Sequence, residues 1–70
     1  MTEVEKARRD EAEGIARLTE KTRELEAQGM THEVARMEAY RRLPNTVAKI
    51  MGARNVIQAS GVYLPPLPIR

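Results

Sequence analysis

The side chains of this 70-residue chain that could take part in acid–base or metal chemistry are carboxylates and a single imidazole. The chain has no Cys and one His, His32, whereas a zinc site needs three or four convergent ligands. Carboxylates crowd residues 3–26, but none falls in a predicted pocket that would shift its pKa for acid–base work. Phosphate-binding loops and nucleophile elbows are absent as well. We therefore predict that the protein is not an enzyme and has no catalytic residues, no metal and no cofactor.

Length and composition predict one small domain that relies on a partner for stability. A domain of about 60 residues removes only about 60% of its unfolded surface from water. Small chains compensate with disulfides, a metal or a partner, and here the partner is what remains. Charged residues make up 31% and apolar residues 41%, which is typical of soluble helical proteins. There is no signal-peptide pattern and no apolar run of the roughly 20 residues that span a bilayer, so we expect a cytoplasmic protein without a membrane partner.

A long first helix is predicted over residues 3–28. Thr2 and Glu5 have the spacing of a capping box, in which the Thr2 hydroxyl accepts from the Glu5 backbone N–H. Gly29 suits the position after the helix, where a positive φ is needed. Gly14 is interpreted as tolerated on a solvated stretch, with a close backbone approach as the alternative. Residues at 3-4-3 spacing form a seam for packing another helix, which we predict to be a homodimer interface: Ile15, Leu18, Thr22 and Leu25.

Two shorter helices are predicted to follow, over residues 32–42 and 46–59. Thr31 and Asn45 are suited to be their N-caps, and Pro44 separates them. The second helix is expected to bury the stripe Val34, Met37, Tyr40 and Leu43. The third helix is expected to end at Ser60-Gly61 and to bury Val47, Ile50, Met51, Val56 and Ile57.

The fold class that follows is all-α, with a single helical domain over residues 1–61 and an extended Pro-rich tail over residues 62–70. The prolines of the tail favour a conformation close to polyproline II. Its segment Leu64–Arg70 matches the apolar-Pro-x-apolar-Pro-x-basic pattern of SH3 ligands. The simpler interpretation is that the start of the tail packs across the helices or a partner subunit through Val62, Tyr63 and Leu64.

A nucleic-acid interpretation is open for residues 46–60. Residues 46–57 resemble the first helix and turn of a helix-turn-helix DNA reader, with the small Ala48 four residues before the turn glycine, Gly52. The resemblance implies a second helix that presents an Arg and an Asn to base edges. The second helix lacks the expected buried β-branched residue, and an ordinary amphipathic helix is the alternative. The DNA-binding candidates in this interpretation are Lys49, Arg54 and Asn55.

Charge is unevenly distributed along the chain, whose net charge is +2. Residues 1–29 carry six basic and eight acidic side chains, net −2, whereas residues 30–70 carry six basic and two acidic ones, net +4. An acidic partner is therefore expected to meet the second half. Tyr and Arg are enriched at the centres of protein interfaces. The candidates for contact with another protein are Gln28, Arg36, Tyr40 and Arg41.

In size, charge and helical plan the chain resembles the early host-takeover proteins of phages, including those that inhibit the LasR quorum-sensing regulator and the type IV pilus ATPase. This resemblance implies a small phage or bacterial inhibitor that binds a host protein, such as a transcriptional regulator, stoichiometrically. It is a resemblance of format without a diagnostic motif, so it implies no site residues. Two other functions stay open: a helix-turn-helix-like DNA-binding protein, and a subunit of an oligomeric assembly or scaffold.

Overall fold

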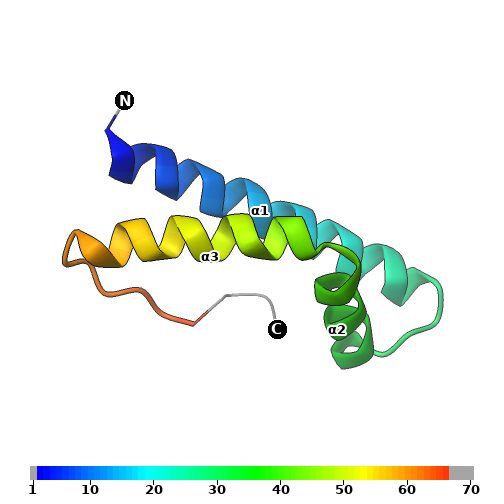
Figure 1. The fold of residues 1–70 in the computed structure, drawn as a ribbon. Coiled ribbons are helices and arrows are strands. Elements are labelled where there is room, and N and C mark those ends of the chain that lie inside the picture. Colours follow the sequence, from blue (N-terminus) through cyan, green and yellow to red (C-terminus); the bar gives the residue numbers. More distant parts are fainter. Residues whose placement is uncertain (1, 67–70) are drawn as a thin grey trace.

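Three α-helices build the protein, and the structure, a computed structural model, describes residues 2–66. α1 spans Glu3–Ala27, α2 spans His32–Arg42 and α3 spans Pro44–Ala59. α1 and α3 lie side by side and antiparallel, while the short α2 packs near the C-terminal end of α1 (Figure 1). The molecule is elongated, with principal extents of 41 × 19 × 15 Å. For the described residues, the predicted all-α class with one long and two shorter helices is confirmed.

The two ends of α1 follow from local chemistry. Thr2 Oγ1 accepts a hydrogen bond from the Glu5 backbone N–H at 3.2 Å, which satisfies one of the amides that a helix start leaves free. The Thr2 hydroxyl also donates to the Glu5 carboxylate at 3.1 Å. The helix ends at Ala27, and Gly29 adopts a φ of +101°, a conformation that favours glycine. Both predicted ends are therefore confirmed to within one residue.

Gly14 is a point of close contact between α1 and α3, which corrects our prediction of a solvated glycine. It is buried, and a Cβ added there would lie 2.4 Å from Ile50 Cγ1 and 2.9 Å from Ile50 Cδ1. Only a residue without a side chain lets Ile50 pack directly on the α1 backbone. The prediction was wrong because the part of α1 before Gly14 is rich in charged residues, whereas the burial of Gly14 is imposed by α3.

The short helices begin in two different ways. Thr31 is the N-cap of α2, as predicted, and its hydroxyl accepts from the Val34 backbone N–H at 3.3 Å. α3 begins at Pro44 rather than at residue 46, so the predicted cap Asn45 lies inside the helix. Pro is suited to the first helical position because its φ is already helical and its missing N–H would have no partner there. The predicted end of α3 is confirmed, since Ser60 is its C-cap and Gly61 has a φ of +91°.

The core consists of two apolar clusters along the α1–α3 pair. The first joins all three helices through Leu18, Leu25, Ala35, Ala39 and Ile50. The second is made of Ala7, Ala53 and Ile57, and the tail residues Val62 and Leu64 pack against it. Half of the buried apolar residues are alanines, so the helices approach closely but bury little side-chain volume. Among residues 2–66, the large apolar side chains that are fully buried are Leu18, Leu25, Ile50 and Ile57.

The buried face of α3 differs in part from the predicted one. Ile50 and Ile57 are buried as expected, and the third buried residue is Ala53. The predicted core residues Met51 and Val56 are 45% and 39% exposed. A small side chain at the contact between two closely packed helices explains the difference, because the larger neighbours are then turned toward solvent.

The segment after α3 returns along the helix pair (Figure 1). Its residues Val62 and Leu64 are partly buried against the second apolar cluster, whereas Tyr63 between them is exposed. The Arg54 guanidinium donates a hydrogen bond to the backbone carbonyl of Pro65. The SH3-ligand pattern is described only in part, because its residues 67–70 lie outside the described residues.

Candidate protein-binding surface

α2 presents its larger apolar side chains to solvent and its small ones to the core. Ala35 and Ala39 are fully buried, whereas Val34 is 50% and Met37 62% exposed. Our prediction that Val34 and Met37 face the core was therefore wrong. Two alanines four residues apart let α2 approach α1 closely. Their spacing indicates the buried face of α2, but the larger side chains of Val34 and Met37 favoured the opposite face. Of the predicted stripe, Tyr40 and Leu43 do pack against the core cluster.

The outer surface of α2 consists of exposed residues on the side away from the core together with the half-buried Arg36 and Tyr40 beside them. Three of the four predicted partner-binding residues lie on this helix, whereas Gln28 is the exposed C-cap residue of α1. The Arg36 guanidinium lies 5.8 Å from the centroid of the Tyr40 ring, which fixes both side chains through a cation–π contact. We define the α2 outer surface by its members Val34, Arg36, Met37, Tyr40 and Arg41.

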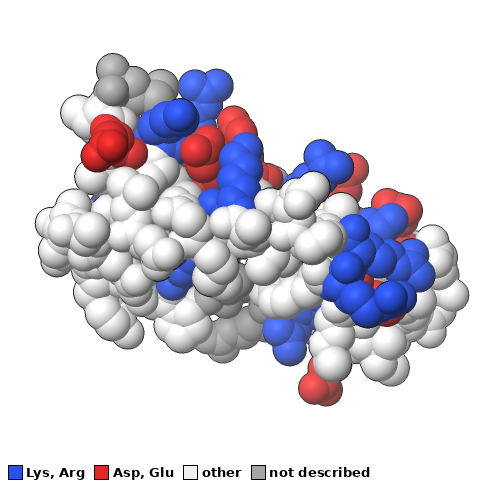
Figure 2. All heavy atoms as spheres, viewed as in Figure 1, with Lys and Arg blue, Asp and Glu red and all other residues white. Residues whose placement is uncertain are grey.

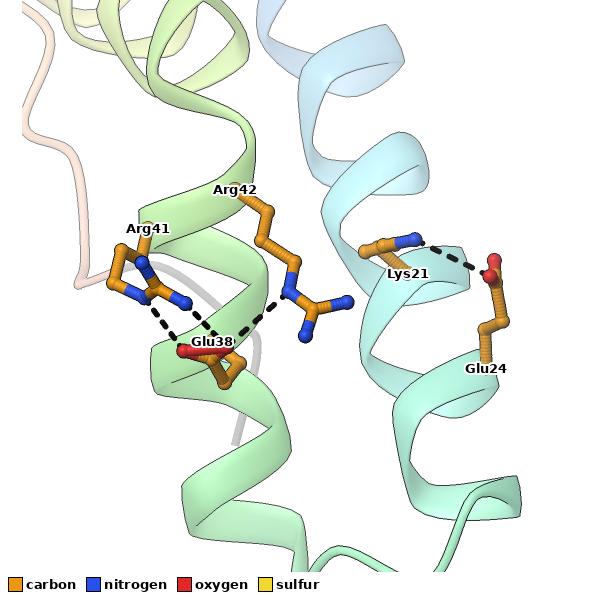
Figure 3. A network of polar contacts seen from close by, with 5 residues as sticks. All are labelled: Lys21, Glu24, Glu38, Arg41 and Arg42. Atoms are coloured by element: carbon orange, nitrogen blue, oxygen red, sulfur yellow. Dashed lines mark hydrogen bonds and ion pairs between the residues drawn. The ribbon is translucent and has the colours of Figure 1, made fainter.

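Glu38 connects two arginines at the C-terminal end of α2 (Figure 3). Arg41 donates to its carboxylate in bidentate fashion at 2.6 and 3.0 Å, and Arg42 donates at 3.2 Å. The hydrogen bonds from Arg41, aided by the charge of Arg42, hold the pKa of Glu38 below its usual value, and Glu38 in turn raises the pKa of Arg41. The two guanidinium groups also suit the last turn of a helix, where the macrodipole favours cations.

The side of α2 that faces α1 borders a shallow charged hollow rather than an apolar pocket. Figure 3 shows Arg42 between α2 and α1, opposite the ion pair of Lys21 with Glu24, whose Nζ–Oε1 distance is 3.2 Å. The hollow measures about 350 Å³ and lies between charged side chains. Alternating charges of this kind are well solvated, so we place the binding surface on the outer side of α2. The residues that line the hollow are Arg17, Glu20, Lys21, Glu24 and Leu43.

The three DNA-binding candidates lie on one continuous helix, which agrees with the ordinary helix predicted here and contradicts the helix-turn-helix interpretation. Gly52 lies inside α3 and makes no turn. Arg54 donates to Glu11 at 2.8 Å, and Lys49 lies 3.3 Å from Glu13. Both cations are thus paired with carboxylates of α1. The third candidate, Asn55, is exposed and uncharged. Lys49 also lowers the pKa of Glu13, with a smaller contribution from Arg9.

The predicted dimer seam lies in the core of a single chain. Leu18, Thr22 and Leu25 are buried, and Ile15 packs partly buried against the same cluster. The Thr22 hydroxyl donates to the Leu18 carbonyl at 2.8 Å, so its burial leaves no polar atom unpaired. The helices that cover this seam are α2 and α3 of the same chain, and a second copy that meets the folded chain needs another surface.

Within residues 2–66, His, Asp and Glu side chains do not converge in threes, as a metal ion would require. No helix in this part of the chain combines the length and apolar character needed to cross a membrane.

No protein-family model matches the chain, and no curated protein or solved structure matches it.

Proposed function

We propose that this chain is a small non-enzymatic regulator that acts by stoichiometric binding to another protein, such as a transcriptional regulator, through the α2 outer surface. The observation that carries the proposal is the exposure of Val34 and Met37, half or more of whose surface meets solvent beside Tyr40. Met, Tyr and Arg are the residue types enriched in interface cores. Their combination on one short helix is typical of a helix that docks into a groove.

The chemistry of the surface indicates the kind of groove that it fits. Met37 and Val34 supply apolar area, and the flexible Met thioether adapts to an irregular wall. Arg36 and Arg41 flank them with positive charge, and Arg41 is held in place by Glu38. A complementary partner therefore offers an apolar groove with an acidic rim. Both the apolar area and the arginines are accessible in the folded chain, so docking requires no unfolding.

The functional unit in this proposal is a homodimer. The chain fully buries only four large apolar side chains in its described part, and each contributes about 1.5–3 kcal/mol. A second copy adds buried area without any other component, because it is synthesised together with the first.

The test is affinity capture of a partner from a nuclease-treated bacterial lysate with the tagged protein. We expect one partner at near-stoichiometric yield, and we expect Met37→Glu to lose it because the new carboxylate opposes an acidic-rimmed apolar groove. The matched control is Ala12→Glu, which adds the same charge at an exposed position of α1. Retention of the partner by Met37→Glu would place binding elsewhere, and recovery that disappears with nuclease would indicate a nucleic-acid partner.

A further inference from the structure

α3 has a solvent-facing side without charge, unlike the other two helices. Only Lys49 and Arg54 are charged among its 16 residues, and both pair with carboxylates of α1. In Figure 2 the surface over α3 is mostly white, while blue and red gather along α1 and on α2. A helix that is hydrophobic all round is typically buried on all sides, and the exposed side of α3 carries the apolar side chains of Met51 and Val56.

The uncharged, solvent-facing side of α3 has a shape against which another helix could pack. A line of small or neutral residues at spacings of four and three runs along it, and two larger apolar side chains flank the line. The flanking residues Met51 and Val56 are 45% and 39% exposed. A Cβ added at Gly52, in the middle of the line, would meet no atom within 4 Å, so the backbone of another helix has room to approach there. We define the α3 outer face by Ala48, Met51, Gly52, Asn55, Val56 and Ala59, all of which are exposed.

An open groove between α3 and α1 continues this face on one side. Its volume is about 370 Å³, and its floor includes Ala7, Ala53 and Val56. The chain's own tail packs through Val62 and Leu64 against the cluster that contains Ala7 and Ala53. The open groove is bordered by two carboxylates and two ammonium groups, namely Glu3, Asp10, Lys6 and Lys49.

Charge decides what kind of partner fits. A two-fold axis brings the residues near it together with their own symmetry mates, so any charge at the centre of such an interface faces a like charge. The α3 outer face meets this condition because its central residues are uncharged. The groove beside it carries equal numbers of acidic and basic groups, so two copies meet there without net repulsion. A polyanion, by contrast, finds no free cation on the α3 outer face.

We propose that the α3 outer face is the surface through which two copies of this chain associate, with their α3 helices in closest contact near Gly52. The inference rests on the homodimer proposed above and supplies its interface. It also leaves the α2 outer surface of both copies free for another protein.

The test is sedimentation equilibrium over a range of protein concentrations, with far-UV circular dichroism to verify the fold. We expect a wild-type dimer and a dissociation constant about 100-fold or more higher for Met51→Glu, because two added carboxylates are then brought together out of water. Met37→Glu is the matched control, since it makes the same change at an exposed methionine of α2. It should stay dimeric.

The outcomes separate this inference from the proposed function. A Met51→Glu protein that remains folded and as dimeric as wild type would overturn the α3 interface. A wild-type chain that is monomeric at every concentration would overturn the dimer itself. A partner that Met51→Glu loses and Met37→Glu retains, with a monomeric wild type, would show that the α3 outer face binds a different protein. Loss of the captured partner in Met37→Glu concerns the α2 outer surface alone.

Discussion

At the scale of single residues, the two glycines inside helices have opposite environments. Gly14 is buried against Ile50, whereas Gly52 faces open space. We expect Gly14→Ala to lower the free energy of unfolding by about 1–3 kcal/mol, because the added methyl overlaps Ile50. We expect Gly52→Ala to raise it by up to about 1 kcal/mol, because alanine favours the helix and meets no neighbour. Urea unfolding followed by far-UV circular dichroism measures both.

Each variant is the control for the other, since both replace a helical glycine by alanine. The measurement is made in a Met51→Glu background, so that association of two copies does not contribute. Equal stabilisation by the two substitutions would mean that the contact between Gly14 and Ile50 is looser than the structure has it.

Single residues could be predicted from the sequence where their role depends on close neighbours along the chain. The caps Thr2, Thr31 and Gly29 were predictable because a cap depends on atoms within a few positions along the chain. Gly14 and Gly52 could not be told apart, since both interrupt a helical pattern at the same intrinsic cost. Their difference arises from which residue of a distant helix lies opposite, and local sequence does not contain that.

At the scale of elements, α2 carries one carboxylate, Glu38, that pairs with two arginines of its last turn. Arg41 and Arg42 both bind Glu38 and hold its pKa below the ordinary 4.5. The pKa of Glu38 is lower in the folded than in the unfolded state. The contribution of its ion pairs to stability is therefore fully present above about pH 4.5 and is lost as the pH falls through the pKa of the folded state. We therefore expect the thermal midpoint to decrease with acidification over this range, and less steeply in Glu38→Gln.

The measurement is the unfolding temperature at a series of pH values, at low and at high salt. Glu33→Gln is the matched control, because Glu33 is an exposed carboxylate in the first turn of the same helix. Salt should reduce the difference between wild type and Glu38→Gln, since the ion pairs are at the surface. If the unfolding temperatures of wild type and Glu38→Gln decreased identically with acidification, Glu38 would not be the carboxylate responsible.

The bounds of the helices could be predicted from the sequence, but the faces that they bury could not. The bounds of α1 and α2 follow from caps, glycine and proline, and only the start of α3 moved, from residue 46 to Pro44. The faces were harder because Val34 and Met37 form as regular a stripe as Ala35 and Ala39 do. Helical periodicity alone does not decide between two such faces when the buried one is made of small residues. The candidate surface was therefore predicted only in its polar members, Arg36, Tyr40 and Arg41.

At the scale of the whole molecule, the small core explains why two helices keep apolar side chains on their outer faces. α1 is the common partner of α2 and α3, which contact each other little. Each short helix is thus covered on one side and open on the other, which leaves Met37 and Met51 on separate outer faces. One chain can in this way carry a surface for its own copy and another for a different protein.

Leu18 is the residue that tests whether the seam on α1 belongs to one chain or to two. It is fully buried in the cluster that joins the three helices. Replacing a buried leucine by alanine costs about 2–5 kcal/mol, a large share of the roughly 4–10 kcal/mol expected for a chain of this length. We expect Leu18→Ala to lower the free energy of unfolding by that amount in wild type and equally in the Met51→Glu background, which we expect to be monomeric.

The dependence of this cost on protein concentration is decisive because the alternatives differ in what supplies the neighbours of Leu18. If α2 and α3 of the same chain supply them, the cost is independent of protein concentration. If a second copy supplied them, the cost would disappear once the copies are apart. Met37→Ala serves as the exposed control and should change stability by no more than about 0.5 kcal/mol. A Leu18→Ala penalty that falls as the protein is diluted would restore the α1 seam as a contact between two copies.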